Sequence, residues 1–326
     1  MLKKILITGG AGYIGSIVAE KLKQYKIVII DNLSTGKKKF LNKKWKFYKT
    51  DLSNTEKVSN IFRKENFDAI IHFAASISVE ESQKNQKKYF QNNFVNTKNL
   101  INLSKKYNVK KFIFASTASV YDSCNINISE TFKKNPLNNY GKTKLDSEEY
   151  LIKNFNLVNF QYVVLRFFNV AGSNNNYTRG PVPDLSKHLI RNICVNYIKR
   201  NYKIHIYGSN YKTPDGTCIR DFIHVKDLAD ICELSLKKLF ISKNIRTILN
   251  CGYGYGYSVL EVVKTFEKIV SKKIKIIFTK ERIGDPASVV CSNYKLKRFL
   301  KWRPRHNDLN FILRNSLKWF KKYYNK

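Results

Sequence analysis

A tyrosine and a lysine, Tyr140 and Lys144, stand four residues apart in the segment NNYGKTKLDSEEY. Residues at this spacing share one face of a helix, so the lysine ammonium can lie beside the phenol. A phenol has an ordinary pKa of about 10 and is a poor base, but nearby positive charge favours its phenolate form. The pair could therefore remove the proton from a substrate hydroxyl. It could equally lie on a solvated helix face, because 20 tyrosines and a large lysine excess produce such pairs by chance.

Two hydroxyl residues precede this pair. The apolar segment KKFIFAS (110–116) is typical of a buried strand, and it ends at Ser116 with Thr117 directly after it. We expect these side chains at the carboxyl edge of a parallel sheet, where open α/β folds bind ligands. A hydroxyl there could hydrogen-bond the same substrate oxygen that Tyr140 deprotonates.

A glycine-rich run, TGGAGYIG, lies between an expected strand and an expected helix and contains Gly9, Gly12 and Gly15. Glycines let such a turn tighten and let the backbone approach a pyrophosphate, which the N–H groups at the helix start can bind. Asp31 follows 22 residues after Gly9, at the end of the next strand, and is placed to bind an adenosine ribose. An acidic residue there disfavours a 2′-phosphate, so NAD is predicted over NADP. A purely structural turn is the alternative.

Asp51, after the third expected strand, has two interpretations. It could contact the adenine of the same cofactor, or it could cap the helix that follows.

If NAD binds, its oxidised nicotinamide ring is a second cation that, with Lys144, would lower the pKa of Tyr140.

The elements that must position these residues alternate between strand and helix through the first half of the chain. Uniformly apolar strands separated by helices indicate a parallel sheet covered on both faces, the doubly wound Rossmann arrangement. Strands are expected at 3–8, 25–32, 46–48, 68–74, 110–116 and 162–168, and helices at 13–25, 54–64, 86–107 and 138–154.

The regularity ends near residue 170, and shorter α and β segments follow. We expect an NAD-binding domain over 1–170 and a smaller α/β substrate-binding lobe over 171–326, with some later elements returning to the first domain. Later helices are expected at 226–240, 258–271 and 308–323, and strands at 247–250 and 274–278.

Composition excludes several classes of function. The net charge of +36 would suit nucleic acid, but the lysines are spread along the whole chain beside abundant Asn and Ile, as an A/T-rich coding sequence would produce. We therefore expect no nucleic-acid partner. No apolar run approaches the roughly 20 residues that cross a bilayer. The six cysteines are scattered without a metal-binding spacing, which predicts a cytoplasmic protein with reduced thiols and no metal.

Several longer motifs extend over nearly the whole chain. They are TGGAGYIGS, DNLSTG, IHFAA, NNFVNT, SVY, NNYGKTKL, RFFNVAG, TPDGTCIRDFIHVKDLAD, GYSVLEVV and RIGDPA. By these motifs the chain resembles the extended short-chain dehydrogenase/reductases, and among them the NAD-dependent epimerases that interconvert UDP-glucose and UDP-galactose. TPDGTCIRDFIHV is the most specific of the motifs.

The resemblance implies a role for each matching residue. Tyr140 would be the base, Lys144 its cation, and Thr117 the hydroxyl that orients the substrate. The residues implied to bind NAD are Gly9, Gly12, Tyr13, Ile14, Gly15, Asp31, Asn32, Asp51, Leu52, Phe73, Asn92, Tyr140, Lys144 and Phe168. Those implied to bind the UDP-hexose are Thr117, Asn169, His188, Leu189, Tyr207, Arg220, Arg282 and Asp285. Arginine suits a diphosphate, because its forked donors match phosphate oxygens.

The implied reaction oxidises C4 of the sugar to a ketone, rotates the keto sugar and reduces it on its other face. A sugar 4,6-dehydratase is disfavoured, because Ala118 and Ser119 stand where dehydratases carry an acidic pair. Epimerisation of UDP-N-acetylglucosamine or UDP-glucuronate stays open, since the position that limits sugar bulk falls on the small residue Val289. A basic, non-catalytic NAD-binding protein is a further alternative. The resemblance also implies a homodimer formed through the helices at 86–107 and 138–154.

Overall fold

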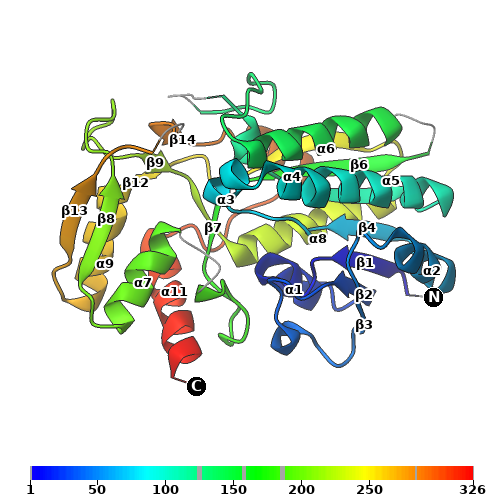
Figure 1. The fold of residues 1–326 in the computed structure, drawn as a ribbon, viewed down its shortest axis with the longest axis horizontal. Helices are drawn as coiled ribbons and strands as arrows, with labels where there is room; N and C mark the ends of the chain where they lie inside the picture. The colour runs from blue at the N-terminus through cyan, green and yellow to red at the C-terminus, as the bar shows by residue number, and fades with distance from the viewer. Residues whose placement is uncertain (1, 123–126, 156–158, 184–187, 283–284, 326) are drawn as a thin grey trace. The chain divides into compact units, whose positions relative to one another are not determined.

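The computed structural model describes residues 2–122, 127–155, 159–183, 188–282 and 285–325 (Figure 1). The chain divides into two compact units. Unit 1 comprises residues 1–122, 133–166 and 229–249, and unit 2 comprises residues 123–132, 167–228 and 250–326. The expected assignment of cofactor to a first domain and substrate to a second stays a prediction.

Unit 1 is built on a seven-stranded parallel sheet in the order β11-β6-β5-β4-β1-β2-β3 (Figure 1). The order reverses beside β1, as in a doubly wound nucleotide-binding sheet, so the predicted fold class is confirmed. The strands are β1 Lys4–Thr8, β2 Lys26–Asp31, β3 Lys46–Lys49, β4 Ala69–His72, β5 Lys111–Thr117, β6 Gln161–Phe167 and β11 Arg246–Cys251.

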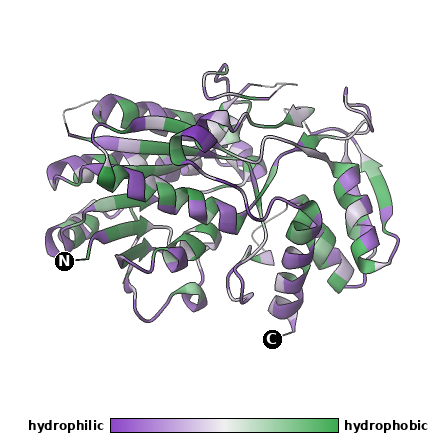
Figure 2. Ribbon diagram, turned by 180° about the vertical axis from the view of Figure 1, so that it is seen from behind, coloured by the Kyte–Doolittle hydropathy of each residue, from purple (hydrophilic) through white to green (hydrophobic). Residues whose placement is uncertain are grey.

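The strands of this sheet are apolar because both faces are covered. Ile5, Leu6 and Ile7 of β1 are completely buried, and Figure 2 shows the strands as largely hydrophobic while the helices alternate in character. The helices are α1 Tyr13–Lys21, α2 Thr55–Glu65, α3 Val79–Lys84, α4 Gln86–Tyr89, α5 Asn96–Lys106, α6 Asn139–Phe155 and α8 Val225–Ile241, with short helical turns η1 Lys38–Phe40 and η3 Ala118–Val120. Phe155 of α6 packs edge-on against Phe112 of β5, which fixes this helix on the sheet.

The helix expected over 86–107 is interrupted. Between α4 and α5 the chain forms a π-helical turn, η2 Phe90–Val95. The backbone carbonyl of Asn93 accepts hydrogen bonds from the hydroxyls of Thr97 and Ser147. Side chains therefore bond the backbone where the helical ladder changes, and such turns often occur at functional sites.

In its described residues, unit 2 is built from small sheets and helices. Its strands are β7 Asn169–Ala171, β8 Lys203–Tyr207, β9 Ile219–Arg220, β10 Phe222–His224, β12 Tyr257–Ser258, β13 Lys275–Thr279 and β14 Ser288–Val289. Its helices are α7 Leu189–Ile198, α9 Val259–Val270, α10 Tyr294–Leu300 and α11 Leu309–Tyr324. A capping box between Ser258 and Glu261 begins α9, close to the start expected from the sequence at residue 258.

Sheet pairings in unit 2 bring distant segments together. β8 pairs with β13, β7 pairs with β10, and β9 lies between β12 and β14. None of β7, α7, β8, β9, β10, β14 and α10 was expected. Within the described residues, no helix is both long and apolar enough to cross a membrane.

Candidate active site

The glycine run forms a tight connection between β1 and α1. Gly9 has a positive φ of 71°, and a Cβ on it would lie 2.6 Å from the backbone nitrogen of Ala74. A Cβ on Gly15 would lie 2.4 Å from the carbonyl oxygen of Gly9. Both positions therefore require glycine for close backbone approach.

The start of α1 can bind an anion. Gly12 occupies the N-cap position and offers no side chain to the first N–H groups of the helix, which belong to Tyr13 and Ile14 and the residues after them. Such N–H groups, with the positive end of the helix dipole, suit a phosphate. This donor set and the narrow glycine turn fit the pyrophosphate of NAD.

Asp31 ends β2 beside this turn. Its carboxylate accepts the N–H of Ala11 at 3.0 Å and that of Leu33 at 2.8 Å. Burial raises the pKa of Asp31, and these two hydrogen bonds oppose the rise. A carboxylate has about four acceptor positions, so Asp31 can still accept hydrogen bonds from ribose hydroxyls.

Asn32 and Asp51 lie side by side. The Asn32 amide donates a hydrogen bond to the Asp51 carboxylate, which also accepts the N–H of Ser53. Asn54, rather than Asp51, caps α2 by accepting the N–H of Lys57 at 3.0 Å. The cap interpretation of Asp51 is therefore wrong, while its contact with adenine stays a prediction. Leu52, its neighbour, packs into the core of unit 1.

Phe73 and Asn92 lie on neighbouring segments at the carboxyl edge of the sheet. The Phe73 N–H bonds the carbonyl of Thr8 at 3.0 Å, and the Asn92 amide donates to the Ser76 hydroxyl at 2.9 Å. The buried side chain of Asn93 bonds the backbone of the same serine. Its amide oxygen accepts the Ser76 N–H at 2.8 Å, and its amide nitrogen donates to the Ser76 carbonyl at 2.9 Å. Sequence reasoning missed Asn93 and Ser76; the doubled asparagine of NNFVNT was the available signal.

The expected catalytic residues come together at the end of β5 and the start of α6. Thr117 lies within hydrogen-bonding reach of the Tyr140 phenol. Lys144, one turn further along α6, donates to the carbonyl of Ala115 at 2.8 Å. Its ammonium also lies 4.7 Å from the centre of the Phe114 ring. The sequence predicts that Tyr140, Lys144 and Thr117 lie close together, and the fold brings them together between β5 and α6.

The electrostatics of this group differ from the expected direction. Burial raises the pKa of Tyr140 to about 12, although Thr117 opposes the rise. Burial also lowers the pKa of Lys144 to about 7, although the charge of Glu148 opposes the fall. The expected lowering of the tyrosine pKa under two cations does not occur with Lys144 alone. A phenolate at neutral pH therefore requires the second positive charge, which a bound nicotinium ring would supply.

Sequence reasoning also missed an ion pair beside the catalytic residues. Glu148, four residues after Lys144, binds Arg166 and accepts a hydrogen bond from the Ser116 hydroxyl. Glu148 and Arg166 are almost completely buried. The spacing Tyr140, Lys144, Glu148 on one helix face was the available signal.

Four of the residues implied to bind the UDP-hexose lie close together in unit 2. Arg220 forms an ion pair with Asp285, and its guanidinium also donates to the carbonyl of Ile219 at 2.8 Å. The Arg282 guanidinium stacks 3.9 Å from the centre of the Tyr207 ring. The N–H of Asp285 bonds the carbonyl of Arg282 at 3.0 Å, which joins the two arginines through one turn. Two guanidinium groups and an exposed aromatic ring suit a diphosphate and a base.

The remaining residues of this set occupy neighbouring elements. Asn169 in β7 lies beside Phe222 of β10, two residues after Arg220. Val289 in β14 lies opposite Arg220 in β9. His188 precedes α7, where Leu189 begins the helix, and the charge of Arg282 reaches the histidine ring. Phe168 is buried in unit 2, where its N–H bonds the carbonyl of Cys251, and its role toward the cofactor stays a prediction.

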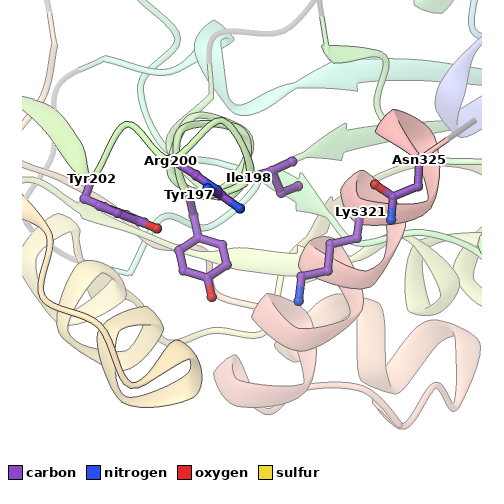
Figure 3. Close-up of a pocket in the computed structure, with 6 residues that line it drawn as sticks. All are labelled: Tyr197, Ile198, Arg200, Tyr202, Lys321 and Asn325. Carbon is purple, nitrogen blue, oxygen red and sulfur yellow. The ribbon is translucent and has the colours of Figure 1, made fainter.

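A separate hollow of about 350 Å³ opens at the far end of α7 (Figure 3). It is lined by Tyr197, Ile198, Arg200, Tyr202, Lys321 and Asn325. The Lys321 ammonium lies 5.9 Å from the centre of the Tyr197 ring. His188 and Leu189 lie at the opposite end of this ten-residue helix, roughly 15 Å away by the rise of an α-helix. The hollow is therefore distinct from the group of residues around Arg220 and Arg282.

Comparison with known proteins gives a consistent result. Residues 5–252 match the NAD dependent epimerase/dehydratase family. The UDP-glucose 4-epimerase of Azospirillum brasilense is 37% identical, over 97% of this chain and 91% of its own. The crystal structure of UDP-glucose 4-epimerase from Bifidobacterium longum in complex with NAD⁺ and UDP has a TM-score of 0.92 and 31% identity, covering 99% of each chain. The UDP-Glc/GlcNAc 4-epimerase from Campylobacter jejuni has a TM-score of 0.84 and 39% identity, covering 98% of this chain and 99% of the other.

Proposed function

The chain belongs to the NAD-dependent epimerase/dehydratase family, and we propose that it interconverts UDP-glucose and UDP-galactose with NAD as its cofactor. The observation that carries the proposal is the meeting of Tyr140, Thr117 and Lys144 in the unit whose glycine turn fits a pyrophosphate. Near full-length similarity to UDP-glucose 4-epimerases supports the same reading.

Tyr140 is proposed to hold the proton of the sugar 4-hydroxyl during oxidation and to return it during reduction. Thr117, beside the phenol, would hydrogen-bond the same sugar oxygen and orient it. Lys144 would provide positive charge that favours the phenolate. Bound NAD would supply the chemistry of hydride acceptance and return at C4 of the sugar. Because the keto sugar is reduced again on its other face, no net redox change occurs.

In unit 2, Arg220 and Arg282 are proposed to bind the diphosphate, with Tyr207, Asn169 and His188 contributing to the nucleotide end. Asp285 would fix Arg220 through the ion pair that joins them. Holding the substrate through its diphosphate leaves the sugar free to turn, which epimerisation requires and tight sugar binding would prevent.

A wider substrate range has two observations in its favour. Val289, a small side chain, lies opposite Arg220 in the paired strands β14 and β9. A similar protein from Campylobacter jejuni is named a UDP-Glc/GlcNAc 4-epimerase. We therefore propose that the chain also accepts UDP-N-acetylhexosamines.

The test is incubation of the purified protein with UDP-galactose and no added NAD, with the products separated by chromatography. We expect UDP-glucose to form without accumulation of reduced cofactor, and the Y140F variant to be inactive. Parallel incubations with UDP-N-acetylgalactosamine and UDP-galacturonate define the sugar range. Absence of the C4 epimer from every substrate, with NAD bound, would refute the proposal and favour a non-catalytic NAD-binding protein.

We further propose a homodimer formed through α4, η2, α5 and α6 of unit 1. Phe90 has 49% of its surface exposed and contacts Phe94, which packs edge-on against Tyr150 of α6. An aromatic cluster that spans η2 and α6 and exposes Phe90 suits an interface. Sedimentation of the wild type should give the mass of a dimer, and F90E should shift it toward the monomer; a monomeric wild type would refute this proposal.

A cytoplasmic location is proposed as well. Cys194, Cys218, Cys232, Cys251 and Cys291 are all free and buried, as expected for a protein kept in a reducing compartment.

A further inference from the structure

A buried ion pair lies directly behind the proposed catalytic residues. The Arg166 guanidinium binds the Glu148 carboxylate with two nitrogens, Nη2 at 2.6 Å from Oε2 and Nε at 3.0 Å from Oε1. A third nitrogen, Nη1, donates to the Tyr121 hydroxyl at 2.7 Å. Both charged side chains retain only 1% of their surface exposed. This is the forked geometry in which an arginine holds a carboxylate in one orientation.

The carboxylate is tied to the strand that carries Thr117. The Ser116 hydroxyl donates a short hydrogen bond to Oε1 of Glu148. The residue before Ser116, Ala115, accepts the Lys144 ammonium through its carbonyl. Three consecutive residues at the end of β5 therefore contact α6: Ala115 through Lys144, Ser116 through Glu148 and Thr117 through Tyr140.

We propose that Glu148, held by Arg166, is a positioning residue that keeps the Lys144 ammonium charged and the end of β5 in register for proton transfer at Tyr140. The proposal rests on the proposed function and deepens it. Neither Glu148 nor Arg166 is needed to touch the substrate or NAD.

The charges around Lys144 support this role. On its own helix it faces Glu148 and Tyr140. From β4 it faces His72, whose pKa is lowered to about 3 by burial and by the Lys144 charge, so that this ring is neutral near pH 7. Arg166 of β6 binds Glu148, and Tyr121, the residue after η3, binds Arg166. Glu148 therefore supplies the negative charge that opposes loss of the Lys144 proton.

The ion pair also explains why a carboxylate can be buried there at all. Burying an unpaired carboxylate costs several kcal/mol, and the forked hydrogen bonds from Arg166 offset that cost. The pair also favours the charged form of the arginine. Burial lowers the pKa of Arg166, but Glu148 and Tyr121 together raise it above its ordinary value. Arg166 thus holds the Glu148 carboxylate in one orientation on the helix that carries Lys144.

The test separates this charge from simple packing. E148Q alone removes the carboxylate that binds the buried Arg166 guanidinium and can unfold the protein, so the decisive variant combines E148Q with R166M. The glutamine can still accept the Ser116 hydroxyl, and the methionine fills the space of the arginine without a charge. The matched control is E149Q, which changes the adjacent carboxylate on the exposed face of α6.

The first readout is the pH profile of kcat for UDP-galactose. The double variant removes the Glu148 and Arg166 charges together, and of these two it is the Glu148 charge that opposes loss of the Lys144 proton. Lys144 should then lose its proton at lower pH, so the alkaline limb should move down by about one pH unit. At neutral pH, kcat should fall about tenfold while KM changes less than about threefold, because the residues proposed to bind UDP are untouched. A folded double variant with the wild-type pH profile overturns the proposal, whatever its kcat. E149Q should match the wild type.

The second readout does not depend on epimerase activity. The ultraviolet absorbance of tyrosinate is titrated in the NAD-loaded wild type and in Y140F, and the difference isolates Tyr140. The same difference is taken on the double-variant background. We expect Tyr140 to ionise at higher pH there, and an unchanged titration overturns the proposal. If the wild type lacks epimerase activity, the proposed function fails, while this titration still decides the role of Glu148.

Discussion

The Cα of Gly141 faces the carbonyl oxygen of Ser119 so closely that a methyl group on it would lie 2.1 Å from that oxygen. Gly141 directly follows Tyr140, and Ser119 lies two residues after Thr117. Alanine is normally favoured over glycine within a helix by about 1 kcal/mol. Here it would force the first turn of α6 away from η3.

We therefore expect G141A to misplace the Tyr140 phenol and to lower kcat/KM by about 100-fold, as small displacements of catalytic groups do. The measurement is epimerase kinetics with UDP-galactose. K142A, which changes the exposed neighbour on the same turn, is the control and should retain activity. Full activity in G141A would mean that α6 and η3 can separate without cost to the site.

The proposed role of Tyr140 gives a second prediction. Y140F should lower kcat by about 10³-fold or more, since proton transfer by a positioned group contributes about 10² to 10⁴. NAD should remain bound, because its pyrophosphate is proposed to bind at the glycine turn rather than at Tyr140. Y150F on the same helix removes a phenol that bonds Asn102, 2.8 Å away, and should leave kcat unchanged. Comparable losses in both variants would point to a general effect on α6.

The third prediction concerns Glu65, at the end of α2. Its side chain has 3% of its surface exposed and binds Lys4 and Lys46. Burial alone would raise its pKa, but hydrogen bonds from Lys46, Tyr48 and Lys4 lower it to about 2. Because the folded pKa is depressed, the stabilisation is fully present above the ordinary value of 4.5 and is lost as the pH falls toward about 2.

Urea unfolding across this pH range tests that assignment. At pH 7 the E65Q variant should lose about 2 to 3 kcal/mol of unfolding free energy, and the gap from wild type should narrow steadily below pH 4.5. E56Q, an exposed glutamate in the first turn of the same helix, should change stability by less than about 0.5 kcal/mol. A gap independent of pH would show that Glu65 acts through packing alone.

The stacked pair of Arg282 and Tyr207 gives a fourth prediction. R282M should raise KM for UDP-galactose by about 10- to 100-fold and weaken inhibition by UDP to a similar degree, because a charged hydrogen bond to a phosphate contributes about 1.5 to 3 kcal/mol. kcat should change much less, since binding is lost equally from substrate and transition state. The control is K280M, which removes an exposed cation two residues before Arg282. A large kcat effect with unchanged KM would assign Arg282 to the chemical step.

The features that sequence predicts well are those encoded locally. The turn around Gly9 needs close backbone approach, and only glycine permits it, so the motif and its geometry coincide. Asp31 and Thr117 follow apolar runs whose lengths set where β2 and β5 end. The helical spacing of Tyr140 and Lys144 likewise places both side chains on one face of α6.

The features that sequence misses depend on distant partners. β9 and β14 have two residues each and exist only through pairing with segments far along the chain. The π-helical turn at Phe90–Val95 depends on hydroxyls of Thr97 and Ser147 that bond the Asn93 carbonyl. In the sequence Arg166 looks like an ordinary strand residue, because its partner Glu148 lies in a different element. The raised pKa of Tyr140 reflects burial, which no spacing of residues reveals.

The threading of the chain has a consequence for its synthesis. Unit 1 is assembled from three stretches, the last of which ends at residue 249, and β11 from that stretch lies at one edge of its sheet. A ribosome adds about 5 to 20 residues per second. The β6 edge therefore stays unpaired for several seconds while residues 167–245 are made. During that interval an unpaired parallel strand edge is open to wrong pairing, so synthesis of residues 167–245 is the stage at which the growing chain is most exposed to aggregation.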